Sequence, residues 1–121
     1  MEIVDANIIL RYLLNDYEIF SVKSRKIIEE KTIFIPFEVC AEVVYVLEKV
    51  YSVPRDQIEQ ALILLINYPN ISTNNNQIAK QALEIFCKEN IDFVDSILVA
   101  YNHIEAYTIH SFDKKLNKLC K

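Results

Sequence analysis

Residues 2–14 read EIVDANIILRYLL, a short run of strand-type residues, one aspartate, and then a longer apolar stretch. The run from Glu2 to Val4 is typical of a strand, and the residues from Ala6 to Leu14 continue as an apolar helix. Asp5 lies at the junction between the two. A strand that leads directly into a helix is the repeating unit of a parallel α/β sheet, so this stretch indicates the fold class.

The same alternation continues along the chain. Three further strands are predicted, at Thr32 to Ile35, Ile71 to Thr73 and Tyr107 to His110. The predicted helices cover residues 6–14, about 17–30, 36–50, 52–65, 74–88, 91–104 and 113–119. Within the second helix, Phe20, Val22, Ile27 and Ile28 form the apolar part of an amphipathic pattern. We therefore predict an α/β fold in one domain, residues 1–121: a three-layer α/β/α sandwich with a central parallel sheet of four to five strands.

Composition sets limits on the class of protein. With 52% hydrophobic and 25% charged residues and a net charge of −4, the chain resembles an ordinary globular protein without the basic excess of a non-specific nucleic-acid binder. The three cysteines are far apart and form no CxxC pair, which argues against structural zinc and disulfides. We expect free thiols, a cytoplasmic location and no membrane segment, because the longest apolar run, Ala61 to Ile66, is far shorter than a spanning helix.

Glycine is absent from the chain. Backbone positions that need a left-handed conformation must therefore be filled by other residues, and asparagine is the next most tolerant type. We expect such positions among the asparagines, which are Asn15, Asn67, Asn70, Asn74 to Asn76 and Asn90.

Acidic residues fall where a parallel sheet places its ligands, beyond the carboxyl ends of the strands. Asp5 ends the first predicted strand and Asp113 follows the fourth. Glu42 lies in the helix after the second strand, and Asp92 and Asp95 lie three residues apart near a helix start. Two carboxylates about 4 Å apart repel by roughly 4 kcal/mol at an effective dielectric near 20, so converging acids require a cation. Oxygen ligands suit Mg²⁺ or Mn²⁺, either of which can polarise a phosphodiester and activate water.

Each acid also has a purely structural interpretation. Asp5 and Asp113 can cap the helices that they precede, and Asp92 can simply complement a helix dipole. Glu42 shares its helical stripe with polar residues, which is typical of a solvated face. Asp95 is more informative, because its helical neighbours are apolar and a charge among them needs a partner or a function.

Four segments, in this order, resemble the PIN domain of the VapC toxin type. They are VDANIILRYLL (4–14), EVCAEVVYVLEKVY (38–51), IDFVDSILVAYN (91–102) and YTIHSFDKKLNKL (107–119). By position, the resemblance implies an acidic quartet that binds Mg²⁺ or Mn²⁺, formed by Asp5, Glu42, Asp95 and Asp113. It also implies that Asp92 is an auxiliary acid and that Asn7 and Ser111 are supporting polar residues. Among the basic residues, Arg11 and Lys114 rank highest as contacts for RNA phosphates.

The resemblance further implies a function and partners. The expected activity is metal-dependent endoribonuclease hydrolysis of RNA phosphodiesters by the toxin of a toxin–antitoxin pair, acting as a homodimer and inhibited by a cognate antitoxin. The sequence departs from the family where Ala6 replaces a usual threonine or serine and where the glycine before the fourth strand is missing, near Glu105 and Ala106.

Two alternatives were weighed. A dehalogenase-type phosphatase would need a second aspartate at the position of Asn7. The other alternative is a catalytically weak or inactive PIN-fold module that binds RNA or protein. Its signature would be the loss of one or more acids of the quartet, and all four are present.

Overall fold

The structure, a computed structural model, describes residues 1–121 and has the α/β composition expected from the sequence. Helices dominate, and the strands are short. In chain order the elements are β1 (Glu2–Ile3), α1 (Ala6–Leu14), α2 (Glu18–Glu30), β2 (Ile33–Phe34), α3 (Phe37–Lys49), α4 (Arg55–Ile66), β3 (Ile71–Ser72), α5 (Asn76–Lys88), α6 (Phe93–Glu105) and α7 (Lys114–Leu119). None of the helices is long and apolar enough to span a membrane.

The sheet is parallel, as predicted, but it has three strands in the order β1-β2-β3 rather than four to five. Each strand contributes two residues, and Ile33 of β2 aligns with Glu2 on one side and with Ile71 on the other. Ile33 and Ile71 are buried, which places the sheet against the core. A sheet this small covers little helix surface, so the helices pack mainly on one another.

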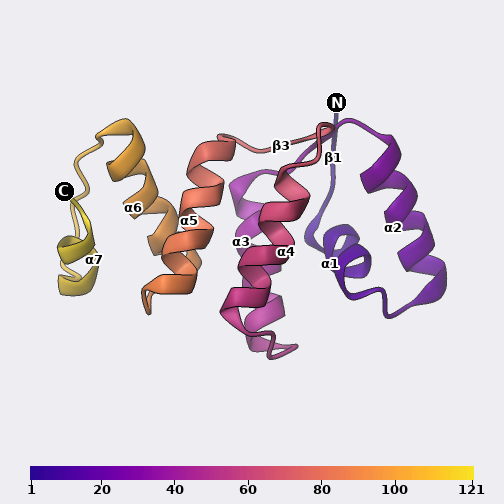
Figure 1. The fold of residues 1–121 in the computed structure, drawn as a ribbon, viewed down its shortest axis with the longest axis horizontal. Coiled ribbons are helices and arrows are strands. Elements are labelled where there is room, and N and C mark those ends of the chain that lie inside the picture. The colour runs from indigo at the N-terminus through magenta and orange to yellow at the C-terminus, as the bar shows by residue number, and fades with distance from the viewer.

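The predicted fourth strand, Tyr107 to His110, is wrong: this segment forms no ladder with any strand. The side-chain amide of Asn102 in α6 donates to the Tyr107 carbonyl at 2.8 Å, and the ring of Tyr101 packs edge-on against the Tyr107 ring. These contacts hold the segment on α6, at the opposite end of the molecule from α1 and α2 (Figure 1). A β-type segment becomes a strand only where a neighbouring strand can pair with it, and β1 lies elsewhere.

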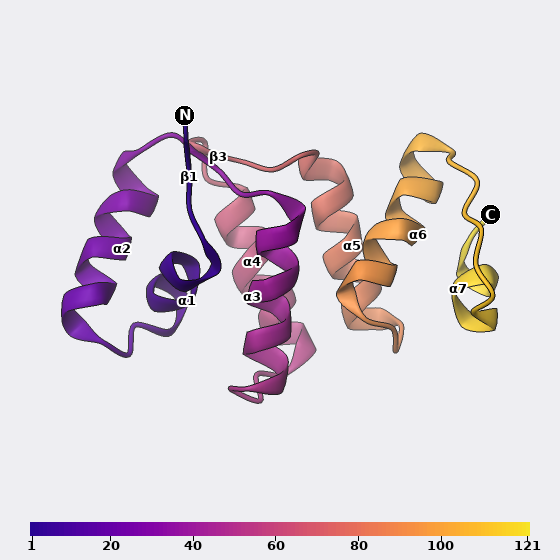
Figure 2. The same cartoon turned by 180° about the vertical axis from the view of Figure 1, so that it is seen from behind.

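The helices stand side by side along the long axis of the molecule, with α7, α6 and α5 towards one end and α1 and α2 at the other (Figures 1 and 2). Helices α3 and α4 lie in the middle. A single cluster of 29 buried apolar residues runs through this row. Fully buried side chains such as Ile58 of α4 and Val99 of α6 show that the interior is closed even where no sheet lies behind it.

The face of α2 that packs inward differs from the predicted one. Ser21 and Ser24 are buried beside Ile28, whereas Phe20 and Val22 are exposed. The hydroxyl of Ser21 donates to the Arg11 carbonyl of α1 at 3.0 Å. Small side chains at this crossing let the two helices approach closely, which turns the larger apolar groups outward.

Left-handed backbone occurs at three residues, of which only Asn15 is an asparagine. It ends α1 with φ 52°. Ser52 and Ala106 are the other two, with φ 54° and 59°. Ala106 ends α6 in the region where the resemblance leads one to expect a glycine. In the left-handed conformation its β-carbon destabilises the fold by roughly 1–2 kcal/mol relative to glycine.

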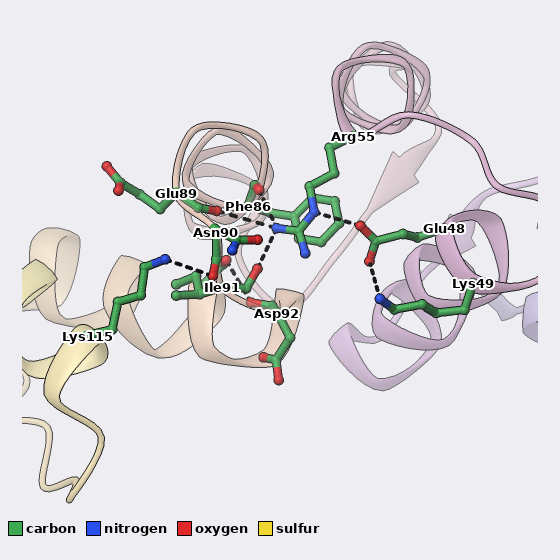
Figure 3. Close-up of polar contacts among 10 residues, drawn as sticks. Glu48, Lys49, Arg55, Phe86, Glu89, Asn90, Ile91, Asp92 and Lys115 are labelled. Atoms are coloured by element: carbon green, nitrogen blue, oxygen red, sulfur yellow. Dashed lines mark hydrogen bonds and ion pairs between the residues drawn. The ribbon is translucent and has the colours of Figure 1, made fainter.

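Arg55, at the start of α4, connects two other helices and the loop between α5 and α6 (Figure 3). Its Nε pairs with the Glu48 carboxylate of α3 at 2.6 Å, and its guanidinium lies 3.9 Å from the ring centre of Phe86 in α5. Its Nη1 donates to the carbonyl oxygens of Phe86 at 2.8 Å, Ile91 at 2.6 Å and Glu89 at 3.4 Å. One side chain thereby satisfies carbonyl groups at the end of α5 and fixes residues 89–92, the loop between α5 and α6.

Arg55→Met keeps most of the aliphatic stem but removes these charge-assisted hydrogen bonds. We expect the free energy of unfolding, measured by urea denaturation, to fall by about 2–3 kcal/mol. Lys49→Met is the matched control, because Lys49 lies 3.7 Å from the same Glu48 carboxylate but is well exposed. Its loss should cost less than about 1 kcal/mol. Equal losses in the two variants would contradict the role assigned to Arg55.

Candidate functional site

Three of the acids singled out in the sequence begin helices. Asp5, Asp92 and Asp113 are the N-cap residues of α1, α6 and α7. Each accepts backbone N–H groups through Oδ1, at distances of 2.8–3.2 Å. In each case Oδ2 makes no hydrogen bond or ion pair. The capping interpretation is therefore correct for Asp5 and Asp113, and Asp92, expected only to complement a helix dipole, is a cap as well. Capping leaves one oxygen of each carboxylate able to bind a ligand.

Asp5 and Glu42 form the first acidic unit, the Asp5–Glu42 pair. They line one cavity of about 250 Å³ between α1 and α3, together with Asn7, Arg11 and Tyr51 among others. Both carboxylates are exposed, and that of Glu42 has no hydrogen-bond or ion-pair partner. Asp5 lies where β1 passes into α1, at the carboxyl end of a parallel strand, and Glu42 lies within α3, both at the predicted places in the secondary structure.

Asp92, Asp95 and Asp113 form the second unit, the Asp92–Asp95–Asp113 group. Asp95 is half-buried in the first turn of α6, and its carboxylate accepts no hydrogen bond. Burial raises the pKa of Asp95, and the negative charges of Asp92 and Asp113 raise it further. These three side chains are therefore close enough to interact electrostatically although they come from two different helix starts.

Two basic side chains hold this group together. Lys115 of α7 donates from Nζ to the Asn90 carbonyl at 3.0 Å, which ties α7 to the loop between α5 and α6. Arg55 holds the same loop from the other side through Ile91, the residue before Asp92 (Figure 3). The loop is thus fixed between α4 and α7, and it sets where the N-cap of α6 lies.

The two units do not form a single metal centre in this structure. No group of three or more histidine, cysteine, aspartate or glutamate side chains is gathered closely enough to hold an ion. The donor chemistry suits Mg²⁺ or Mn²⁺, because every predicted ligand is a carboxylate. The placement of the four acids does not suit a single ion, because the quartet is divided between the Asp5–Glu42 pair and the Asp92–Asp95–Asp113 group.

The predicted supporting residues have different surroundings. The hydroxyl of Ser111 accepts a hydrogen bond from the backbone N–H of Asp113 at 3.0 Å, so it helps to fix the backbone position of Asp113. Asn7 lies beside the Asp5–Glu42 pair and has no hydrogen-bond partner for its side chain. Lys114 is exposed and makes no ion pair. Arg11 pairs with Asp16 at 2.9 Å.

Arg55 and Lys115 were missed in the sequence as residues that organise the site. Their role depends on backbone carbonyl groups of a distant loop, which leave no periodic pattern in the chain. Only the position of Arg55, directly after Pro54 at a helix start, could have indicated its role. A cation in the first turn of a helix interacts unfavourably with the helix dipole, so its presence there suggests another interaction.

The raised pKa of Asp95 predicts how its removal changes stability. Between the unfolded-state pKa and the higher folded-state pKa, the folded protein binds more protons, so stability falls as the pH rises through this window. In EDTA at pH 7, Asp95→Asn should therefore raise Tm above the wild-type value. The gain should vanish below about pH 4, where Asp95 is protonated in both states. Asp56→Asn, an exposed acid in the first turn of α4, is the control and should show no gain. A lower Tm for Asp95→Asn at pH 7 would contradict the assignment.

Comparison with known proteins agrees with the α/β fold. The sequence model of the PIN domain family matches residues 3–121. Searches of curated proteins and of solved structures found no match. The PIN domain is a nuclease-type fold, and its members are generally metal-dependent nucleases. Because the match covers nearly the whole chain, this protein belongs to the PIN domain family.

Proposed function

We propose that this protein is a metal-dependent endoribonuclease that hydrolyses phosphodiester bonds of RNA. The observation that carries the proposal is the family match over residues 3–121, because the matched fold is of nuclease type. The acidic residues support it, since every position of the expected quartet holds a carboxylate with at least one oxygen free of protein partners. The residues proposed to act are Asp5, Glu42, Asp95 and Asp113, with Asp92 as an auxiliary acid.

We propose Mg²⁺ or Mn²⁺ as the cofactor. A divalent ion supplies the positive charge that neighbouring carboxylates and an RNA phosphate both require. Since the structure divides the acids into two units, the proposal requires both units to act on the same ion or phosphate. Metal-binding measurements on variants of each unit test this requirement directly.

The proposal includes a biological setting: the toxin of a toxin–antitoxin pair, in the cytoplasm, as a homodimer with a cognate antitoxin. The free cysteines fit a reducing compartment. Exposed apolar side chains, including Tyr45 of α3 and Leu64 of α4, supply surface for a protein partner. Co-purification with the product of a neighbouring gene, and loss of RNA cleavage in that complex, would support the setting.

The second candidate is an inactive PIN-fold module that binds RNA or protein. The observation in its favour is the division of the acids, because an enzyme of this class needs a gathered site. Metal-dependent cleavage by the purified protein separates the two candidates, since a binding module would retain RNA affinity without turnover.

Asp5→Asn should reduce RNA cleavage in Mn²⁺ by at least about a hundred-fold, the scale of losing one charged contact at a reacting centre. Asparagine caps helices as well as aspartate does, so α1 and its Ile8 hydrogen bond should persist. The measurement is the initial rate on a fluorescent RNA pool, with circular dichroism as the check of folding. Asp56→Asn should cleave at the wild-type rate. Undiminished cleavage by Asp5→Asn would remove this residue from the site.

Ion binding should also appear as a gain in stability. At a Mn²⁺ concentration of a hundred times Kd, the native state gains about 2.7 kcal/mol, a rise of several degrees in Tm. Asp5→Asn and Asp113→Asn remove one acid from each unit, and asparagine preserves both helix caps. If the two units share an ion, each variant should lose most of the increment, while Asp56→Asn keeps it. Loss in only one of the two variants would show that the ion is held by one unit alone.

A further inference from the structure

A cavity of about 460 Å³ lies between α1 and α2. It is not the cavity of the Asp5–Glu42 pair, but it adjoins that cavity. The two share three lining residues, Asn7, Arg11 and Tyr51. A chain-like ligand can therefore pass from one cavity to the other without leaving the surface.

Aromatic side chains form much of its wall. Tyr17 and Phe20 contribute from the start of α2, and Tyr51 from the turn after α3. They are 58%, 59% and 41% exposed, unusually open for rings of this size. The packing of Ser21 and Ser24 against α1 turns Phe20 outward, so its exposure follows from the fold. Exposed rings of this kind are stacking surfaces for nucleobases, which bind aromatic side chains with little sequence preference.

The charges on the cavity are cationic. Arg11 and Lys23 line it, and no acidic residue does. Arg11 is held in place by Asp16 at 2.9 Å, by the Tyr51 hydroxyl at 3.0 Å and by the ring of Tyr17, whose centre is 5.0 Å from Cζ. Lys23 has no ion pair and is exposed. On a protein with a net charge of −4, two cations beside three aromatic rings complement a nucleotide, with phosphate to the cations and base to the rings.

We propose that this cavity binds one nucleotide of single-stranded RNA, next to the phosphate that lies at the Asp5–Glu42 pair. The inference rests on the proposed nuclease function and adds a nucleotide subsite to it. A purely apolar protein segment would leave Lys23 without a partner, so RNA is the occupant that the charges favour.

The test is the affinity for a short 2′-O-methyl RNA, which resists cleavage, measured by fluorescence anisotropy in EDTA. Phe20→Ala should weaken binding about five-fold or more, the scale of one lost stacking contact. Ile19→Ala is the matched control, because Ile19 is an exposed apolar residue of the same helix that does not line the cavity. Its affinity should equal that of the wild type. Both residues are exposed, so neither variant should unfold the protein.

A second variant tests the phosphate contact. Lys23→Ala should lower the slope of log Kd against log salt concentration by about 0.7, the value for one phosphate contact on a single strand. Lys26→Ala, an exposed lysine of the same helix outside the cavity, should leave the slope unchanged. Equal effects of the two lysines would indicate a diffuse field rather than a subsite, and would overturn the proposal.

The outcomes separate the subsite from the nuclease function. No binding of the RNA by the wild type in EDTA, or wild-type affinity in Phe20→Ala, overturns the subsite and leaves the cavity to an apolar protein partner. Cleavage of RNA in Mn²⁺ would then still support the nuclease. Conversely, if Phe20→Ala and Lys23→Ala lose affinity as expected but the wild type cleaves no RNA, the subsite stands and the enzymatic function fails.

Discussion

The guanidinium of Arg55 is the contact on which the second half of the molecule depends. It joins α3 to α4 through Glu48, and it joins α4 to the end of α5 and to the following loop through backbone carbonyl groups. With only six strand residues in the whole sheet, the helices cannot be ordered by strand pairing alone. A planar cation with five N–H donors can satisfy several carbonyl groups at once, which a lysine cannot do with the same geometry. Together with Lys115 and the packing of α6 on α5, this side chain sets the position of α6, and therefore of Asp92 and Asp95.

The acids of the site are also structural residues. Asp5, Asp92 and Asp113 each begin a helix, where backbone N–H groups and the helix dipole stabilise a negative charge. The capping and functional interpretations therefore do not exclude each other. A carboxylate that is oriented through one oxygen presents the other at a fixed place, without a flexible side chain to order. Substitution by asparagine separates the two roles, because it preserves the cap and removes the charge.

The sequence predicted the features that depend on local pattern. Three parallel strands, seven helices and the helix starts occupied by acids all follow from periodicity and from residue types at element ends. The failures concern features that depend on distant partners. Tyr107 to His110 has the composition of a strand, but its contacts go to α6, and no strand is near enough to pair. Phe20 fits an apolar helical face, but the close crossing of α1 and α2 selects Ser21 and Ser24 as the buried face instead.

The distribution of charge explains why the site is divided as it is. Five acids in one place would repel strongly without a cation. Burial is the main reason that the pKa of Asp95 is raised, and the charges of Asp92 and Asp113 raise it further. The fold limits this repulsion by keeping the Asp5–Glu42 pair apart from the other three acids. Of the two cations of the neighbouring cavity, Arg11 also lines the cavity of the Asp5–Glu42 pair, and Lys23 does not. In the proposed function, an RNA strand bound there would bring its phosphate to the less crowded acids first, and the positive charge that gathers all five acids would be that of a divalent ion.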